Sequence, residues 1–315
     1  MVTRQGFFRI LVALAIAVAA FLVYRSLGRY SLEEIRISVA AIPQQRLILA
    51  FVFVIASYTC LSGFDWLAVR YAGHALAYRQ TALASFCSLS IGHNVGMAAL
   101  SSGAVRYRFY TRWGLSGEQV AKVIIFCGVT VGIGLMTLAG LALIVTRGQG
   151  GDLLGLNETS AVLLGSACLL VPVLYLLICW RVRRPLVIHR WSFQPPSLGL
   201  AFGQVVVGTL NFACVAACVY QLMLGLASAN YLTVATAYVT ANLAALISHV
   251  PGGLGVLEAT ILGILPTGGA IGALVVFRIL YFFVPLMVGV PMLVASEAYF
   301  RRQPRRRPIS KQAAG

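Results

Sequence analysis

The feature that most constrains this chain is a series of long apolar runs. A helix needs roughly 18–25 apolar residues to cross a hydrocarbon core of about 30 Å. The runs that meet this length cover about 7–24, 47–67, 119–146, 161–180, 199–224, 231–248 and 270–298. Backbone groups in lipid must be paired within their own segment, and these runs are continuous rather than alternating. The sequence therefore predicts an all-α fold, a polytopic membrane helical bundle.

Composition and charge agree with a bilayer as the solvent. Hydrophobic residues make up 60% of the 315 residues and charged residues only 10%, too few to cover a water-soluble surface. The formal net charge is +16, and the bases stand mainly between and after the apolar runs. This placement predicts orientation and contact with anionic phospholipid, and no binding of nucleic acid. The seven cysteines lie in apolar stretches without a CxxC pair, so we expect packing residues, no metal site and no cofactor.

Two further apolar segments, 81–103 and 249–266, are interrupted by glycine and polar residues. The arginine-rich 181–190 loop and 301–315 tail predict that both termini are cytoplasmic, which requires an even number of crossings. We therefore expect about eight crossings, with 249–266 as the eighth and 81–103 as a re-entrant or broken segment. Residues 1–300 form one transmembrane domain in this interpretation, and 301–315 form a basic cytoplasmic tail.

Other local patterns predict helix contacts and one interfacial helix. Residues 25–46 have apolar side chains on one helical face and several arginines, as in an amphipathic helix at the membrane surface. The GxxxG pairs Gly128/Gly132 and Gly199/Gly203 predict close approach between helices.

Ionisable residues inside apolar runs identify a candidate site, because such groups are costly in a membrane. Glu258 lies two turns after a Pro-Gly-Gly break, and Arg278 in the next apolar run is its most plausible partner. This pair either joins two helices or lines a polar cavity that handles a charged substrate. Asp65 and Lys122 lie near span ends and are expected to reach the interface.

Glycine breaks occur at corresponding places in the two halves of the chain. His93-Asn94-Val95-Gly96 interrupts one apolar segment, and His249-Val250-Pro251-Gly252 interrupts the other. Paired broken helices are typical of a transporter with an inverted repeat and a substrate site near the bilayer midplane. Irregular backbone at this depth implies a cavity, and the helix start after Gly253 and Gly255 would attract an anion such as phosphate. The alternative is that glycine and proline only bend a helix for packing.

A basic and aromatic segment follows the first break. Arg106, Arg108 and Arg112, with Tyr110 and neighbouring aromatic residues, form a collar where a helix meets water. Such a collar either anchors the helix or collects a lipid phosphate through bidentate hydrogen bonds.

Three segments in order give the chain a resemblance to a known family. They are Arg106-Tyr-Arg-Phe-Tyr110 with Gly114-Leu115, Pro251-Gly-Gly-Leu-Gly-Val-Leu-Glu258, and Arg278-Ile-Leu-Tyr281 with Pro285. With this order and spacing, the sequence resembles the transmembrane flippase-like domain of the lysylphosphatidylglycerol synthetase family, including its stand-alone bacterial inner-membrane members.

The resemblance implies a lipid translocase in the bacterial cytoplasmic membrane, with aminoacylated phosphatidylglycerol as the candidate lipid. In two-domain members a soluble C-terminal domain makes that lipid, and this chain ends shortly after its last apolar run. We therefore expect no aminoacyl-transferase activity, and as partners a homo-oligomer or a separate lipid-modifying enzyme. The expected substrate-binding residues are Arg106, Arg108, Arg112, Tyr110, His93, Asn94, His249, Pro251, Gly252, Gly253, Gly255, Glu258, Arg278 and Tyr281.

Two other functions stay open at this point. A membrane-embedded transferase acting on an isoprenoid-phosphate lipid is disfavoured, because metal-dependent versions need neighbouring acids and the only aspartates are Asp65 and Asp152. A non-catalytic membrane scaffold leaves the buried charges without a purpose.

Overall fold

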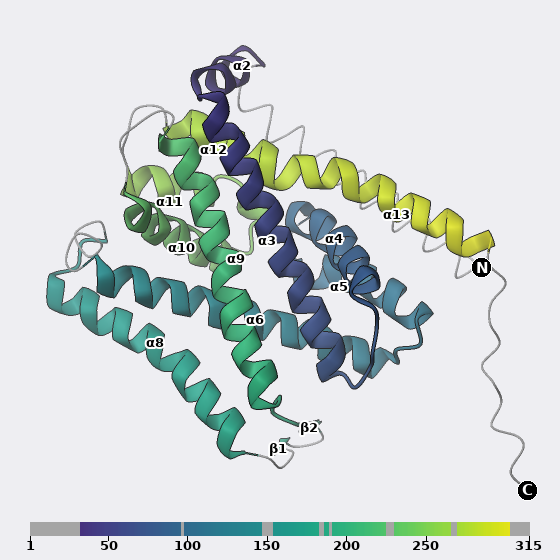
Figure 1. The fold of residues 1–315 in the computed structure, drawn as a ribbon. Coiled ribbons are helices and arrows are strands. Elements are labelled where there is room, and N and C mark those ends of the chain that lie inside the picture. The colour runs from purple at the N-terminus through teal and green to yellow at the C-terminus, as the bar shows by residue number, and fades with distance from the viewer. Residues whose placement is uncertain are drawn as a thin grey trace, which may run out of the picture.

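The computed structural model describes residues 32–95, 98–146, 154–182, 186–188, 191–224, 230–265 and 270–302. The predicted span at 7–24 and most of the basic tail at 301–315 lie outside the described residues. The elements drawn in Figure 1 are α2 (Leu32–Ala41), α3 (Gln44–Tyr71), α4 (Tyr78–Val95), α5 (Ala98–Arg112), α6 (Gly117–Val145), α8 (Glu158–Arg181), β1 (Leu186–Ile188), β2 (Trp191–Phe193), α9 (Leu198–Leu224), α10 (Tyr231–Ser248), the 3-10 turn η1 (Pro251–Gly253), α11 (Val256–Ile264), α12 (Ala270–Arg278), the π-helical turn η2 (Ile279–Phe283) and α13 (Val284–Arg302).

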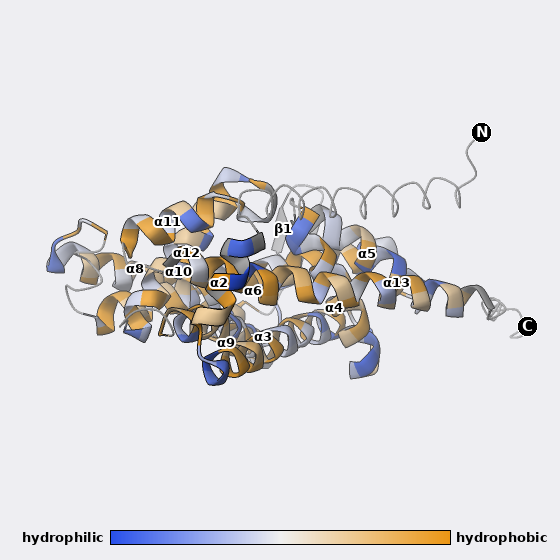
Figure 2. Cartoon of the chain, turned by 90° about the horizontal axis from the view of Figure 1, so that it is seen from above, coloured by the Kyte–Doolittle hydropathy of each residue, from blue (hydrophilic) through white to orange (hydrophobic). Residues whose placement is uncertain are grey.

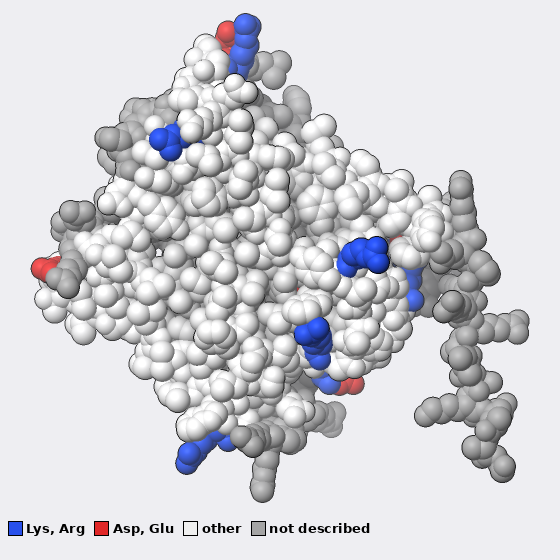
Figure 3. Space-filling model, in the orientation of Figure 1, with Lys and Arg blue, Asp and Glu red and all other residues white. Residues whose placement is uncertain are grey.

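The predicted all-α membrane bundle is confirmed. Within the described part of the chain, six helices are long and apolar enough to cross a bilayer: α3, α6, α8, α9, α10 and the continuous helix Ile271–Phe300. The antiparallel ribbon β1–β2 joins α8 to α9 and is only three residues long on each side. Apolar residues extend onto the outside of the helices in Figure 2, and the charged side chains on the face in Figure 3 are few and scattered.

The centre of the bundle is the long contact between α3 and α9, with α6 beside both. Polar caps fix where some of the surrounding helices begin. Ser116 and Gln119 form a reciprocal capping box at the start of α6, and the Asn157 side chain accepts from the Ser160 backbone N–H at the start of α8. The long helices therefore begin at sites that the local sequence specifies.

The closest approach between helix backbones occurs at glycines other than those predicted. A Cβ atom on Gly134 of α6 would lie 2.3 Å from the backbone carbon of Gly208 in α9, so only glycine fits at this crossing. A Cβ on Gly128, Gly132 or Gly199 would meet nothing within 4 Å. The GxxxG prediction was therefore wrong for these three glycines, whereas a Cβ on Gly203 would lie 3.2 Å from the Leu67 side chain of α3.

The first broken segment, 81–103, is a helical hairpin made of α4 and α5, which confirms the predicted break. α4 begins beside Trp66 near the end of α3 and ends beside Tyr58 in the middle of α3. α5 then packs against α4 and returns to the level of Asp65. The hairpin therefore enters the bundle from one end, turns near the middle and leaves at the same end.

The second broken segment belongs to a hairpin made of α10 and α11, which pack against each other. α10 begins where Tyr231 meets Tyr220 of α9. The neighbouring residue Gln221 accepts a hydrogen bond from Arg46 at the start of α3, so this is the end of the bundle opposite to the start of α4. η1, which follows α10, contacts α4. The second hairpin thus enters from the opposite end and meets the first.

The assignment of 249–266 as a full crossing was wrong. α11 has nine residues, and at 1.5 Å per residue it is about 14 Å long, half of what a bilayer core requires. The segment instead turns at η1 and leads back toward α12, which packs against α2. Broken backbone explains the error, because an apolar segment of the right length was in fact a turn followed by a short helix.

Both halves of the chain have the order long helix, hairpin, long helix, in opposite directions, as in an inverted repeat. α3, the α4–α5 hairpin and α6 form the first set, and α9, the α10–α11 hairpin and the α12–α13 helix form the second.

α2 confirms a helix within the 25–46 segment, and its Arg36 and Ile37 side chains are exposed.

Candidate functional site

The two hairpin tips meet in the middle of the bundle. A Cβ atom on Gly252 in η1 would lie 3.3 Å from the backbone oxygen of His93 and 3.8 Å from that of Asn94, both at the end of α4. The His93 ring is 6.2 Å from the ring of Tyr58, which stands near the midpoint of α3. The breaks of the two halves therefore converge, as the sequence predicted, near the middle of the bundle.

Arg278 at the end of α12 holds the second tip together. Its guanidinium donates to the backbone oxygens of Gly252 and Gly253, the latter at 3.0 Å. It also donates to both carboxylate oxygens of Glu258, at 2.6 and 3.0 Å. The side chains are 5% exposed for Arg278 and 13% for Glu258, so the predicted ion pair is present and almost fully enclosed.

Glu258 also caps the start of α11. Its carboxylate accepts a hydrogen bond of 2.9 Å from the backbone N–H of Gly255, which caps the helix. Gly252, Gly253 and Gly255 all have positive φ, between 59° and 82°. Residues other than glycine rarely adopt positive φ, which explains why these three positions of the turn are glycine.

The helix that carries Arg278 widens into a π-helical turn, η2, directly after it. Such a turn leaves carbonyl groups without their usual partners, and π turns often occur at functional sites. The Asn94 amide donates to the Phe282 backbone oxygen at 3.1 Å and so ties the tip of the first hairpin to this turn. Arg278 also lies 4.7 Å from the centre of the Phe282 ring.

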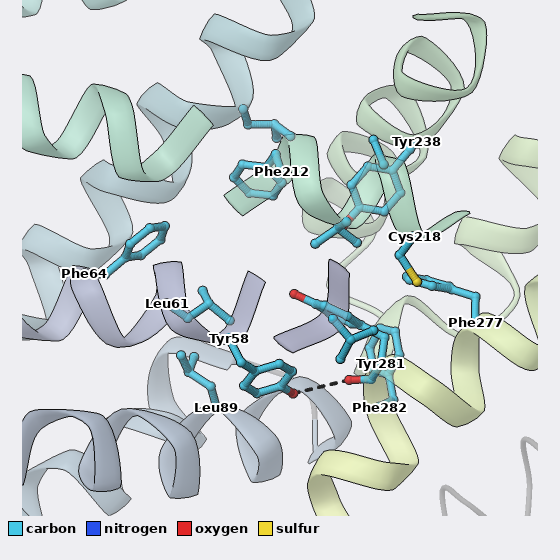
Figure 4. Packing of buried hydrophobic residues seen from close by; sticks show 14 of the residues in the cluster. Tyr58, Leu61, Phe64, Leu89, Phe212, Cys218, Tyr238, Phe277, Tyr281 and Phe282 are labelled. Carbon is cyan, nitrogen blue, oxygen red and sulfur yellow. Dashed lines mark hydrogen bonds between the residues drawn. The ribbon is translucent and has the colours of Figure 1, made fainter. Parts of the chain in front are cut away.

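Aromatic residues surround the meeting point. Tyr281 stacks on His93 at 5.9 Å, and its hydroxyl lies 3.1 Å from that of Ser57. Its backbone oxygen accepts from the Tyr58 hydroxyl at 3.2 Å (Figure 4). The Nδ1 atom of His93 is buried and has no hydrogen-bond partner within the described structure. Buried polar atoms almost always form a hydrogen bond. The Nδ1 atom of His93 is therefore an exception, a buried polar atom at the hairpin tips without a hydrogen bond.

Arg106 and Tyr110 are not at the tips. Arg106 makes a bidentate ion pair with Asp65, at 2.8 Å for both bonds, and the Tyr110 hydroxyl donates to the same carboxylate at 2.6 Å. Asp65 is fully buried, so the expectation that it reaches the interface was wrong. Lys122, in contrast, is well exposed and bonds Glu118 one turn earlier.

Arg108 and Arg112 share one acidic partner, Glu297 of α13. The Arg112 bond is 3.0 Å, and its side chain is 30% exposed against 14% for Glu297. Arg108 and Arg112 therefore join α5 to α13.

His249 also lies away from the hairpin tips. It is exposed, has a φ of 52° and ends α10, with its ring nitrogen 2.8 Å from the Ile247 backbone oxygen.

Sequence reasoning missed the acids that pair with the collar arginines. Asp65 and Glu297 are two of only eight acids in the chain, and both stand in or beside apolar runs. Matching every acid in an apolar run to an arginine would have paired them, because an unpaired charge there is costly.

Comparison with known proteins places this architecture in a family. Residues 10–289 match the lysylphosphatidylglycerol synthase TM region. The chain belongs to this family. An uncharacterized protein of Synechocystis is 30% identical over 91% of this chain and 90% of its own length. The inner membrane protein YbhN of Escherichia coli is 31% identical over 75% of this chain and 76% of its own length.

Proposed function

We propose that this family member, in the bacterial cytoplasmic membrane, moves the headgroup of a phospholipid across the bilayer while the acyl chains stay in lipid. The observation that carries the proposal is the contact between two hairpin tips that enter from opposite ends. Each hairpin extends from its own end of the bundle only as far as the tips. Movement of one hairpin at a time would open the tips to one side and then to the other, as in alternating access.

The chemistry of the tips suits a phosphate. Arg278 donates to two backbone oxygens and a carboxylate, and phosphate oxygens can replace the backbone acceptors with bidentate geometry. When the hairpins part, the carbonyls of Gly252 and Gly253 leave the guanidinium and the phosphate takes their place. The unused Nδ1 of His93 offers a further polar contact beside it.

Glu258 gives the site a preference for a headgroup that carries a cation as well as a phosphate. Its carboxylate faces Arg278 in the closed state, and separation of the pair would let it accept from an ammonium group. The family described above is named for lysylphosphatidylglycerol, which has both groups. We therefore propose aminoacylated phosphatidylglycerol as the first lipid to test.

The test is lipid exchange in liposomes that contain the purified protein. Labelled phosphatidylglycerol, its lysyl derivative and phosphatidylethanolamine are followed from the inner to the outer leaflet. Glu258→Gln and Arg278→Gln should slow exchange at least about tenfold, which corresponds to ~1.4 kcal/mol in the barrier. Glu118→Gln is the matched control, because that carboxylate is exposed at the start of α6, far from the tips.

Folding is checked separately by thermal unfolding in detergent. Wild-type exchange rates in Glu258→Gln and Arg278→Gln, at equal protein levels, would remove the ion pair from the mechanism and with it the proposal.

A further inference from the structure

A groove lies on the outside of the bundle, where α4 packs between α3 and α13. It consists of two adjoining hollows of about 580 and 590 Å³, each within the roughly 300–1,000 Å³ of small-molecule sites. Arg79, Leu83 and Met292 line both hollows and so join them into one groove.

The character of the groove changes along its length. One part is apolar and open to the outside, and Phe51, Ile55 and Val288 on its walls are 41%, 53% and 47% exposed. It reaches Tyr58, beside the hairpin tips. The other part is also mainly apolar, but its lining includes the polar and aromatic side chains of Arg79, Gln80, Trp113, Ser296 and Tyr299. Apolar walls with a polar, aromatic end match the structure of a lipid lying at a membrane surface.

Arg79 is the charged group at the junction of the two hollows. Its side chain is exposed, and it has no carboxylate or hydrogen-bond acceptor within the described part of the chain. The arginines nearby are occupied: Arg108 and Arg112 bond Glu297, and Arg70 stacks over the Trp66 ring at 3.6 Å. A guanidinium at the membrane surface without a protein anion favours a phosphate as its partner.

We propose that this groove binds one glycerophospholipid, with an acyl chain along the apolar walls toward Tyr58 and the phosphate on Arg79. The groove recognises the acyl chain by shape and apolar area, and Arg79 selects a lipid that has a phosphate. Binding at this site does not depend on the transport proposed above, and its test requires no transport.

The experiment is native mass spectrometry of the full chain in detergent with added phosphatidylglycerol or with diacylglycerol of the same acyl chains. Wild type should retain one phosphatidylglycerol and much less diacylglycerol. Arg79→Gln should reduce retained phosphatidylglycerol about tenfold, the size expected for one charge-assisted contact. Ala82→Trp fills the apolar hollow and should abolish retention of both lipids.

Matched controls lie elsewhere on the membrane-facing surface. Arg181→Gln removes an exposed arginine from the end of α8, and Ala167→Trp adds the same bulk to an exposed position of that helix. Both should retain phosphatidylglycerol as wild type does. Retention that is equal in Arg79→Gln, Ala82→Trp and the controls, or equal for both lipids in wild type, would overturn the proposal.

Discussion

The ion pair between Arg106 and Asp65 is sealed inside the bundle, with side-chain exposures of 4% and 0%. Removing one partner leaves the other charge buried and unpaired, which costs about 3–5 kcal/mol. We expect Arg106→Gln to lower the stability measured by thermal unfolding in detergent by this amount. The double variant Asp65→Asn/Arg106→Gln should lose less than Arg106→Gln alone. A double variant that is less stable than Arg106→Gln alone and Asp65→Asn alone would mean that this ion pair is not what holds α5 to α3.

Gly252 is a second residue whose identity the structure explains. Its φ of 61° is strained for any residue with a side chain, and a Cβ there would lie only 3.3 Å from the His93 oxygen. Gly252→Ala should cost about 1–2 kcal/mol from backbone conformation alone. Gly263→Ala in the helix α11 is the control, because a Cβ there meets nothing within 4 Å and alanine favours the helix. Equal unfolding temperatures for the two variants would contradict the geometry assigned to the tip.

At the residue scale the sequence predicted the Glu258–Arg278 pair but missed the acids Asp65 and Glu297 as partners of the collar arginines. Glu258 and Arg278 were paired correctly because they stand in consecutive apolar segments, where few partners are available. Arg106 was assigned to a lipid phosphate because nothing local indicates that α5 folds back along α4, which brings Arg106 to Asp65 of α3. Pairing over such distances in the chain depends on topology, which residue types alone do not specify.

At the scale of elements, the crossing of α6 and α9 depends on Gly134 and Gly208. A methyl group on Gly134 would overlap the backbone of α9, so the helices must separate, and overpacking of this kind costs about 1–3 kcal/mol. Gly134→Ala should therefore lower the unfolding temperature, and Gly128→Ala in the same helix should not. If Gly128→Ala proved the more harmful of the two, the register of this crossing would be wrong.

The hairpins show which parts of an element a sequence reveals. The break within 81–103 was predictable, because glycine, histidine and asparagine interrupt an apolar run. The turn at 251–253 was recognised as a break, but the following residues were counted into a crossing because they remain apolar up to Leu265. Apolar composition indicates that a segment avoids water. It does not distinguish a helix that crosses the membrane from one that turns back inside the bundle.

At the scale of the whole molecule, two re-entrant hairpins change the number of crossings but preserve its parity. α3, α6, α8, α9 and the α12–α13 helix are long and apolar enough to cross, and α10 belongs to a hairpin although its length alone would allow it to cross. With the span predicted at 7–24, the total is even. Both termini then lie on one side, which the arginines of the 181–190 loop and the tail predict to be the cytoplasm.

This topology predicts which positions a membrane-impermeant thiol reagent reaches. In a cysteine-free background, Ala77→Cys before α4 and Glu118→Cys in the first turn of α6 should react only in inside-out vesicles, because the first hairpin returns to the side from which it enters. Asn230→Cys before α10 should react only in intact spheroplasts, because the second hairpin enters from the opposite side. Labelling of Ala77→Cys and Glu118→Cys from different sides would make α4 and α5 a crossing. Labelling of all three from one side would remove the opposed arrangement on which alternating access depends.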